Sequence, residues 1–374
     1  PLVMTSGNLT EEPIACDNAE ALRRLAGLAD AFLLHNRDIA SRYDDSVWQV
    51  TGLAEGQAMA GAAGRGDAEA VSLSEVAQPV RRARGYAPFP IRLPFPVAPV
   101  LAAGADLKNT FCLGREEYAF ISQHIGDMEN LETLEHWEST LALYRRLFRL
   151  EPAHVACDLH PDYLSTRAAQ AFARRAGLPA PLPVQHHRAH IAACLADNGW
   201  TRADGPVIGV ALDGTGYGED GAIWGGEWFV GDYAHLRRAA HLEYLPLPGG
   251  DAATRYPARI AAGYLYATLG PEAAPADLLP ADLRAALWQQ LERRLNTPQT
   301  SSMGRLFDAV SALLGVCREM TYEAQAAIEL EQISAPADGT LPPAFSFALD
   351  LPADGLAVRV GPLLADILAD MRRG

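Results

Sequence analysis

The sequence has no long apolar run, few cysteines and no excess of basic residues. No apolar stretch approaches about 18 residues, the length from which a transmembrane helix is expected, so we expect no spanning segment and no membrane partner. The first residues, PLVMTSGN, lack a basic segment followed by an apolar core, which argues against a signal peptide. We therefore expect a cytoplasmic protein.

The cysteines are too few and too scattered to form a disulfide framework or a zinc ribbon. No CxxC pair occurs, and the number of cysteines is odd. We expect buried thiols, and we expect Cys194 to pack on the apolar face of its helix rather than to bind a metal. The five are Cys16, Cys112, Cys157, Cys194 and Cys317.

Acidic residues outnumber basic ones, with a formal net charge of −15 over 374 residues. A general nucleic-acid surface needs clustered lysine and arginine, so we expect no nucleic-acid partner. An acidic surface suits a protein partner or a small substrate, although charge does not choose between them. The length and the hydrophobic fraction of 49% allow two or three domains with a large core.

The most informative stretch is VQHHRAHIAACLADNGWTRADGPVIGVALDGTGYGEDGAIWGGE. His186 and His190 stand four residues apart, so a helix that continues through IAACLA projects both imidazoles from one face. Two such imidazoles can share a divalent metal. A surface or helix-terminal histidine pair is the alternative.

A short apolar run at residues 207–212 predicts a buried strand, with Asp213 at its end. A carboxylate at this position completes a metal triad of two histidines and one carboxylate. The glycines of DGTGYG let backbone N–H groups approach a phosphate, and we place Gly214, Thr215 and Gly216 in a nucleotide site. The alternative is a simple hairpin turn, since residues 222–230 predict the next strand.

Outside this stretch, the sequence predicts a loop, a linker and several helices. Residues 52–78 are rich in glycine and alanine and predict a mobile loop. Five prolines in residues 88–99 predict an extended linker. Helical periodicity covers residues 18–33, and helical segments are expected over roughly 252–296. Residues 301–304 present a small-residue turn and an N-cap before a helix over 305–315.

Eight motifs in order resemble the HypF carbamoyltransferases of [NiFe]-hydrogenase maturation. They are MTSGNLTEEPI, RRARGYAP, GADLKNTFCL, SQHIGDMENLETLEHW, VQHHRAHIAA, VALDGTGYGEDGAIWGGE, LPLPGGD and SSMGRLFDAVSALLG. The resemblance covers nearly the whole chain. It implies an α/β protein in which a fragment of a YrdC-like domain precedes a two-lobed, TsaD-like domain of the actin-like ATPase fold (ASKHA).

The resemblance also implies domain bounds and a chain that is incomplete relative to the family. Residues 1–87 correspond to the C-terminal part of the YrdC-like domain, 88–99 to a linker and 100–374 to the TsaD-like domain. In the family, a further segment beyond the equivalent of residue 374 supplies one more metal-ligating aspartate. This chain would then hold three protein ligands, and the fragment alone would have reduced activity or none.

The resemblance assigns roles to residues outside the metal triad. Lys108 and Asn109 become catalytic candidates, with Lys108 neutralising phosphate or the leaving group, although a solvated surface lysine is the alternative. The remaining candidates would hold ATP or carbamoyl adenylate. They are Ser6, Asn8, Arg42, Ser46, Gly250, Asp251, Gly304 and Asp308, together with the glycine-rich turn.

The activity implied by the resemblance is an ATP-dependent carbamoyl transfer. Carbamoyl phosphate and ATP, with Mg, would give carbamoyl adenylate, and the carbamoyl group would pass to the C-terminal cysteine of HypE, the partner. The resident metal would be iron or zinc. Three alternatives stay open: an O-carbamoyltransferase, a tRNA threonylcarbamoyl transferase and a non-catalytic actin-like nucleotide-binding scaffold.

Overall fold

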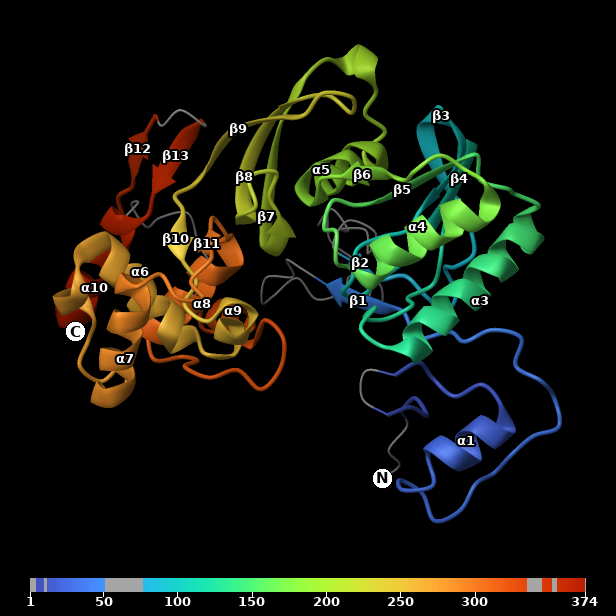
Figure 1. Ribbon diagram of the computed structural model, residues 1–374, viewed down its shortest axis with the longest axis horizontal. Helices are drawn as coiled ribbons and strands as arrows, with labels where there is room; N and C mark the ends of the chain where they lie inside the picture. The colour runs from blue at the N-terminus through green and yellow to red at the C-terminus, as the bar shows by residue number, and fades with distance from the viewer. Residues whose placement is uncertain (1–4, 10–11, 51–76, 335–344, 352–354, 374) are drawn as a thin grey trace, which may run out of the picture. The chain divides into compact units, whose positions relative to one another are not determined.

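The computed structural model divides the chain into two compact units, Pro1–Val184 and Gln185–Gly374, which are taken in turn (Figure 1). The residues it describes are 5–9, 12–50, 77–334, 345–351 and 355–373. Within these ranges no helix is both long and apolar enough to cross a membrane. The domain bounds proposed from the sequence stay a prediction.

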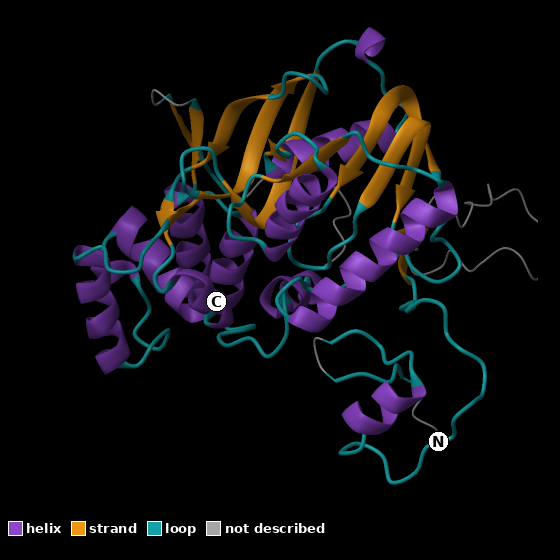
Figure 2. Ribbon diagram, turned by 45° about the vertical axis from the view of Figure 1, so that its right-hand side comes forward, coloured by secondary structure: helices purple, strands orange, loops and turns teal. Residues whose placement is uncertain are grey.

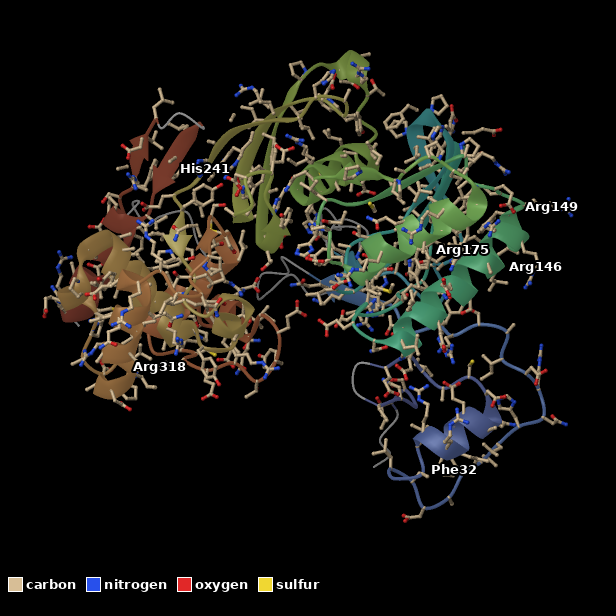
Figure 3. All side chains as sticks on the ribbon, in the orientation of Figure 1. Phe32, Arg146, Arg149, Arg175, His241 and Arg318 are labelled. Carbon is tan, nitrogen blue, oxygen red and sulfur yellow. The ribbon has the colours of Figure 1, made fainter. Side chains whose placement is uncertain are left out.

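Unit 1 begins with a short helix, α1 (Asn18–Arg24), which is capped by the side chain of Asp17. The predicted helix over 18–33 is therefore too long. Its apolar face has little to pack against, since Leu28 is 67% exposed, and Phe32 lies beyond the helix end (Figure 3). The predicted mobile loop over 52–78 lies outside the described residues, apart from its last two.

Unit 1 contains a two-stranded sheet and a four-stranded sheet. β1 pairs antiparallel with β2, and a second sheet has the order β4-β3-β5-β6, in which only the β3–β4 pair is antiparallel. The bounds are β1 (Val47–Val50), β2 (Ala77–Arg81), β3 (Ile91–Ala102), β4 (Cys112–Ile121), β5 (His154–Asp158) and β6 (Leu182–Val184).

Strand β3 corrects the expectation of a linker over residues 88–99. The segment is extended, as its prolines require, but from Ile91 onward it belongs to β3 and pairs with β4, and β5 pairs on the other side from Val100. Proline has no N–H to give to a neighbouring strand. The register with β4 accordingly shifts between Arg92 and Val97 and again between Val97 and Val100, around the prolines.

Two helices, α3 (Leu131–Phe148) and α4 (Leu164–Ala176), complete unit 1. Trp137 and Tyr144 of α3 are fully buried and meet Phe111 edge to face, with ring centroids 5.9 and 5.3 Å from Phe111. Both helices end in basic residues, which suit the negative end of a helix dipole. Arg146, Arg149 and Arg175 mark these ends (Figure 3).

Unit 2 is built on one mixed sheet with helices packed against it (Figure 2). The order is β10-β11-β8-β9-β13-β12, and β7 also pairs with β8. The strands are β7 (Val207–Tyr217), β8 (Ile223–Gly231), β9 (Arg237–Leu242), β10 (Leu245–Pro246), β11 (Gln299–Thr300), β12 (Ala348–Asp350) and β13 (Leu356–Arg359).

The core of unit 2 lies around α6 and α8, which pack on each other and bury Ile260, Leu265 and Ala309 completely. The helical segments predicted over 252–296 are confirmed as η2, α6, η3 and α7. The helices are α5 (His186–Asp197), η1 (Arg202–Asp204), η2 (Gly250–Arg255), α6 (Pro257–Leu269), η3 (Pro271–Ala273), α7 (Ala281–Glu292), α8 (Met303–Leu313), α9 (Gln325–Ile333) and α10 (Gly361–Arg373).

A buried carboxylate, Glu227 of β8, ties three strands of this sheet together. It is fully buried and accepts hydrogen bonds from Arg238 Nε of β9 at 2.5 Å and from the Ser301 hydroxyl just after β11. The Arg238 guanidinium carbon in turn lies 3.9 Å from the centroid of the Trp224 ring. The charge of Glu227 is therefore compensated at both oxygens.

We predict that Glu227→Ala destabilises unit 2 strongly, because it removes the buried carboxylate nearest to Arg238 and leaves that guanidinium with the more distant Asp220, at 3.7 Å, and the Tyr244 hydroxyl. Loss of one partner of a buried ion pair costs about 3–5 kcal/mol. The matched control is Asp277→Ala, which removes the exposed partner of Arg318 (Figure 3) and should cost less than about 1 kcal/mol. Urea denaturation measures both, and equal losses would contradict the role given to Glu227.

Candidate metal centre

Helix α5 begins at His186 because Gln185 caps it. The side chain of Gln185 accepts a hydrogen bond from the backbone N–H of Arg188, and the helix runs on to Asp197, as predicted. One helical turn therefore brings the Nε2 atoms of His186 and His190 to 3.1 Å from each other. The expectation that both imidazoles share one face of a helix is confirmed.

Asp213 reaches these imidazoles from a bulge in β7. The predicted strand and the hairpin with β8 are confirmed, but the expected burial is wrong for alternate residues, since Ile208, Val210 and Leu212 are exposed. Nor does β7 end before DGTG: it continues to Tyr217. Leu212 pairs with Gly226 and Gly216 with Trp224, so three residues of β7 face one residue of β8. Such a bulge re-aims a side chain, and here it turns the carboxylate of Asp213 toward α5.

The two oxygens of this carboxylate have different surroundings. Oδ1 accepts a hydrogen bond of 2.6 Å from the Gly214 N–H. Oδ2 is buried and has no hydrogen-bond partner among the described residues. Instead it faces three imidazole Nε2 atoms, at 3.3 Å from His186, 3.5 Å from His187 and 3.7 Å from His190. These separations are longer than an ordinary hydrogen bond.

The arrangement of His186, His190 and Asp213 fits a metal ion. Their ligand atoms all lie within 4.8 Å of one another. Bonds of about 2.0–2.1 Å to a tetrahedral zinc place neighbouring ligand atoms roughly 3.3 Å apart, close to the observed separations of 3.1, 3.3 and 3.7 Å. The side chain of His190 is 59% exposed, whereas that of His186 is 19% exposed, so the cluster is open on the side of His190.

The same surroundings decide the charge of Asp213. Burial opposes ionisation of this carboxyl group, but the interactions with His186, His187 and His190 outweigh it and hold the pKa of Asp213 well below its usual range. The carboxylate is therefore ionised and can accept a cation across the physiological pH range.

His187 and Gln185 are the residues that sequence reasoning missed. His187 is fully buried directly beneath the bulge: a Cβ on Gly216 would lie 2.4 Å from its Cε1 atom. The doublet HH, preceded by glutamine, was the available signal. Helical periodicity separates His186 and His190 from His187, but it does not show that His187 faces the same carboxylate.

The predicted nucleotide-binding glycines have distinct structural roles. A Cβ on Gly216 would clash with His187, and one on Gly218 would lie 2.3 Å from Trp224 Nε1. At Gly214 a Cβ would meet only Arg305 Nη2, at an ordinary contact distance of 3.7 Å. Gly214 is therefore the residue of this turn with room beside it. The nucleotide roles of Gly214, Thr215 and Gly216 stay predictions.

The start of α8 packs against the same turn. The Ser302 hydroxyl lies 2.9 and 2.8 Å from the carbonyl oxygens of Asp213 and Gly214 and accepts a hydrogen bond from the Arg305 N–H. This confirms the predicted N-cap. A Cβ on Gly304 would lie 2.9 Å from the Cα of Gly214, so glycine at 304 permits this close approach.

Asp308, a predicted nucleotide ligand, lies on α8 and is only 1% exposed. Burial raises its pKa to about 6, against the opposing effect of Arg305, whose Nη2 lies 2.9 Å away. The other predicted members of this group, Gly250 and Asp251, lie in η2, where Gly250 has a φ of 58°. Their nucleotide roles stay predictions.

The catalytic candidates Lys108 and Asn109 belong to unit 1. Lys108 is exposed, and its backbone N–H donates to Asp127 Oδ1 at 2.6 Å. Asn109 is 2% exposed, and its amide donates to the carbonyl oxygens of Ala103 and Ala105. Asn109 therefore braces the loop between β3 and β4, and the catalytic role of both residues stays a prediction.

The four N-terminal candidates are engaged in local hydrogen bonds. Ser6 Oγ donates to Asn8 Oδ1 at 2.6 Å, and Arg42 donates to both oxygens of Glu20 at 3.0 Å. Ser46 Oγ donates to the Arg84 carbonyl at 2.9 Å. These contacts hold the segment in place, and nucleotide binding by Ser6, Asn8, Arg42 and Ser46 stays a prediction.

The expectation of buried thiols holds only in part. Cys157 and Cys317 are buried, Cys16 and Cys112 are half-buried and Cys194 is exposed. The packing role expected for Cys194 is therefore wrong. Ile191 of α5 is 6% exposed and packs against Gly209, whereas Cys194 lies exposed in the lining of a surface cavity between α5 and β7.

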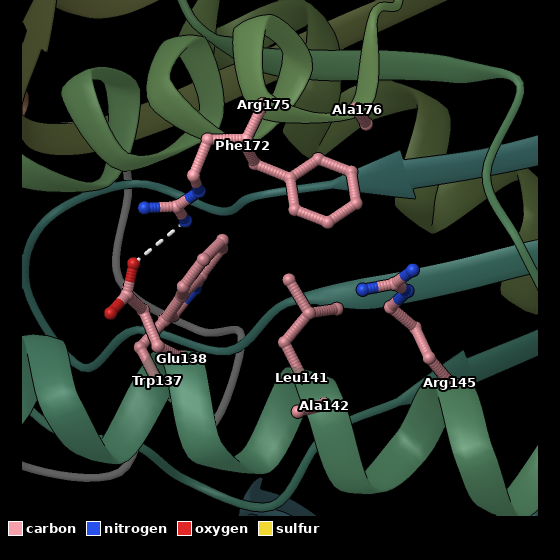
Figure 4. A pocket seen from close by; sticks show the side chains of 8 residues that line it. All are labelled: Trp137, Glu138, Leu141, Ala142, Arg145, Phe172, Arg175 and Ala176. Atoms are coloured by element: carbon pink, nitrogen blue, oxygen red, sulfur yellow. Dashed lines mark hydrogen bonds and ion pairs between the residues drawn. The ribbon is translucent and has the colours of Figure 1, made fainter.

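Each unit has a surface cavity. In unit 1, a cavity of about 360 Å³ lies between α3 and α4, with Glu138 and Arg175 paired at 2.8 Å on its edge (Figure 4). In unit 2, a cavity of about 450 Å³ between α5 and β7 includes His190 and Asp213 in its lining. The second cavity therefore adjoins the cluster of His186, His190 and Asp213.

Three family models match the chain. The HypF Kae1-like domain matches residues 96–197, and the second subdomain of the carbamoyltransferase Kae1-like domain matches residues 209–374. The Sua5/YciO/YrdC model, described as telomere recombination, matches residues 1–58. The predicted order, a YrdC-like fragment followed by an actin-like domain of the TsaD type, is confirmed.

Curated relatives and solved structures agree. Carbamoyltransferase HypF2 of Cupriavidus necator is 46% identical over 334 residues, which are 89% of this chain and 38% of that protein. Carbamoyltransferase HypF of Rhodobacter capsulatus is 40% identical over 375 residues, covering 99% of this chain and 46% of that protein.

A crystal structure of full-length HypF in the phosphate- and nucleotide-bound form is 39% identical with a TM-score of 0.83, covering 99% of this chain and 45% of that one. The chain thus spans less than half the length of these relatives. Sequence, domain order and fold agree, and the chain belongs to the HypF carbamoyltransferase family.

Proposed function

We propose that this chain carries the carbamoyl-transfer site of an ATP-dependent carbamoyltransferase of [NiFe]-hydrogenase maturation. The substrates are carbamoyl phosphate and ATP, with Mg, which give carbamoyl adenylate. The acceptor is the C-terminal cysteine of HypE, and the product is the precursor of the cyanide ligands. One observation carries the proposal: His186, His190 and Asp213 converge within the region that matches the HypF models.

The proposed metal, iron or zinc, would be held by His186 and His190 through Nε2 and by Asp213 through Oδ2. Such an ion supplies a Lewis acid that polarises a carbonyl or phosphoryl oxygen. The chain contributes the geometry. The first turn of α5 sets the spacing of the imidazoles, the bulge in β7 aims the carboxylate, and Gly214 N–H occupies its other oxygen.

The transfer replaces one bond to the carbamoyl carbon by another. A C–S bond forms to the acceptor thiolate, the C–O bond to the adenylate phosphate breaks, and AMP leaves. The cavity beside His190 offers room for the reacting groups, and its lining includes the apolar side chains of Leu195 and Ile208. The nucleophile belongs to the partner, so none of the cysteines of this chain is required.

The phosphate of the adenylate would lie beside Gly214, the residue against which the start of α8 packs. A helix N-terminus favours an anion through its free N–H groups and its dipole. Arg305, whose Nη2 lies near Gly214, adds a positive charge on the same side. Gly304 and Asp308 of α8 complete this proposed nucleotide site, together with Gly250 and Asp251.

The acceptor is proposed to be a protein rather than a nucleic acid. A net charge of −15 disfavours the approach of tRNA, whose backbone is itself anionic. No membrane partner is proposed. Because ATP and carbamoyl phosphate are cytoplasmic metabolites, the reaction is placed in the cytoplasm.

We predict that the purified chain binds one equivalent of iron or zinc, and that His186→Ala or Asp213→Ala lowers the affinity by more than about 100-fold. A direct ligand contributes more than an outer partner, whose loss costs about 10–100-fold. Metal analysis after dialysis and competition with a chelator measure this. The matched control is His235→Ala, which removes an exposed histidine outside the cluster.

Metal content unchanged by both ligand substitutions, or lowered as far by His235→Ala, would reject the centre. Circular dichroism spectra of the variants, compared with that of the unaltered chain, show whether a loss of metal is caused by misfolding.

We predict transfer to HypE when carbamoyl adenylate is supplied to the chain, because the adenylation step is then not required of it. Mass spectrometry of HypE detects the added carbamoyl group, and parallel reactions contain tRNA or small hydroxyl compounds. Cys194→Ser should keep the activity, since the nucleophile belongs to HypE. Transfer to tRNA or to a hydroxyl compound instead, or loss of transfer with Cys194→Ser, would contradict the assignment.

Strong ATP binding that needs no resident metal and yields no carbamoyl transfer would indicate a nucleotide-binding scaffold.

A further inference from the structure

We propose that His187 is a positioning residue: its tautomer is fixed by Gln185, and it donates its Nε2–H to Asp213 Oδ2, holding the carboxylate in place for the metal. The inference rests on the metal centre proposed above. It assigns to the second histidine of the HH doublet a role different from that of the first, although both lie on α5 and face the same oxygen.

The orientation of the Gln185 amide is determined by its neighbours. Its Oε1 accepts from the backbone N–H of Arg188 at 3.1 Å, and a backbone N–H can only donate. Its Nε2 lies 3.3 Å from the carbonyl oxygen of Tyr217, which can only accept. Reversing the amide would place donor against donor and acceptor against acceptor. The NH₂ group of Gln185 therefore points to Tyr217 and to His187.

This orientation fixes the proton of His187. Gln185 Nε2 lies 3.0 Å from His187 Nδ1, and since Gln185 donates there, Nδ1 must be the accepting nitrogen. In a neutral imidazole the other nitrogen then carries the hydrogen. His187 consequently presents an N–H, and no lone pair, to Asp213. It is unsuited to be the third nitrogen ligand, although its Nε2 is nearer to Oδ2 than that of His190.

A buried donor and a buried acceptor thus face each other. His187 Nε2 and Asp213 Oδ2 are 3.5 Å apart, and neither has a hydrogen-bond partner among the described residues. A small rotation of the carboxylate would close this distance to a hydrogen bond. A carboxylate oxygen has two lone pairs, so Oδ2 can accept from His187 and bind a cation at once. Carboxylates that ligate metals are commonly held by such outer partners.

The imidazole of His187 has little freedom to adopt another role. It is completely buried, and a Cβ on Gly216 would lie 2.4 Å from Cε1 and 2.8 Å from Nε2. Backbone of the bulge therefore covers one side of the ring. His187 packs on the turn that carries Asp213 and supports the carboxylate from the buried side, while His190 is on the open side.

The test compares variants that keep or remove the donor at Nε2. His187→Phe keeps a planar ring without a donor, and His187→Gln can return an amide N–H near the position of Nε2. Co²⁺ binding to the full chain is measured by competition with a chelator, together with the visible absorption spectrum of bound Co²⁺. Circular dichroism confirms the fold, and His187→Met replaces the phenylalanine variant if that one does not fold.

We expect one Co²⁺ in every folded variant of His187. Affinity should fall about 10–100-fold in His187→Phe, the usual effect of removing an outer partner, and the spectrum should change because the carboxylate is no longer held. His187→Gln should recover to within about threefold of the original affinity. This recovery is the result that a packing role alone does not produce.

The following results would overturn the inference. An unchanged affinity and spectrum in His187→Phe would show that the donor is not needed, and equal losses in the phenylalanine and glutamine variants would show a packing role. If the unaltered chain binds no Co²⁺, the metal centre itself fails and the inference with it. Loss of binding in His186→Ala, with full binding in His187→Phe, would leave the metal centre standing and remove only the role of His187.

Discussion

One oxygen atom, Oδ2 of Asp213, is the point on which the site depends. It is buried and negatively charged, and it has no backbone donor of its own because Gly214 N–H serves the other oxygen. A charge in such a place must be compensated. Three imidazole nitrogens within 3.7 Å provide the compensation, and they come from one and a half turns of a single helix.

The position of that oxygen is set by interactions on several sides. The bulge in β7 turns the carboxylate toward α5, and Gly225 of β8 permits it, since a Cβ there would lie 2.4 Å from the Asp213 carbonyl oxygen. Ser302 holds the carbonyl oxygens of Asp213 and Gly214 from the start of α8. The preceding residue, Ser301, bonds to the buried Glu227. The cluster of His186, His190 and Asp213 and the start of α8 are therefore held by the same hairpin of β7 and β8.

The helix and the strand that carry the site could be predicted from the sequence, but the bulge and the strand pairing that bring their side chains together could not. Spacing alone places His186 and His190 on one face of a helix, and an apolar run places Asp213 near a strand end. The bulge was not predictable, because its extra residues read as a turn and the pairing of Gly216 with Trp224 beyond it depends on β8. Proline patterning gave the extended form of residues 88–99 but not their pairing with β4, because that pairing depends on residues 112–121, which come later in the chain.

Exposure was the least predictable property, because it depends on what packs against each element. The side chain of His187 lies between two exposed or half-exposed histidines in the sequence, yet it is fully buried, and the apolar context of Cys194 did not prevent its exposure. This asymmetry has a chemical consequence. Within unit 2 the cluster is closed on the side of His187 and Gln185 and open on the side of His190, where the cavity between α5 and β7 adjoins it. Solvent and small molecules therefore reach the cluster from the side of His190, whereas the Asp213 carboxylate is enclosed on the side of His187 and Gln185.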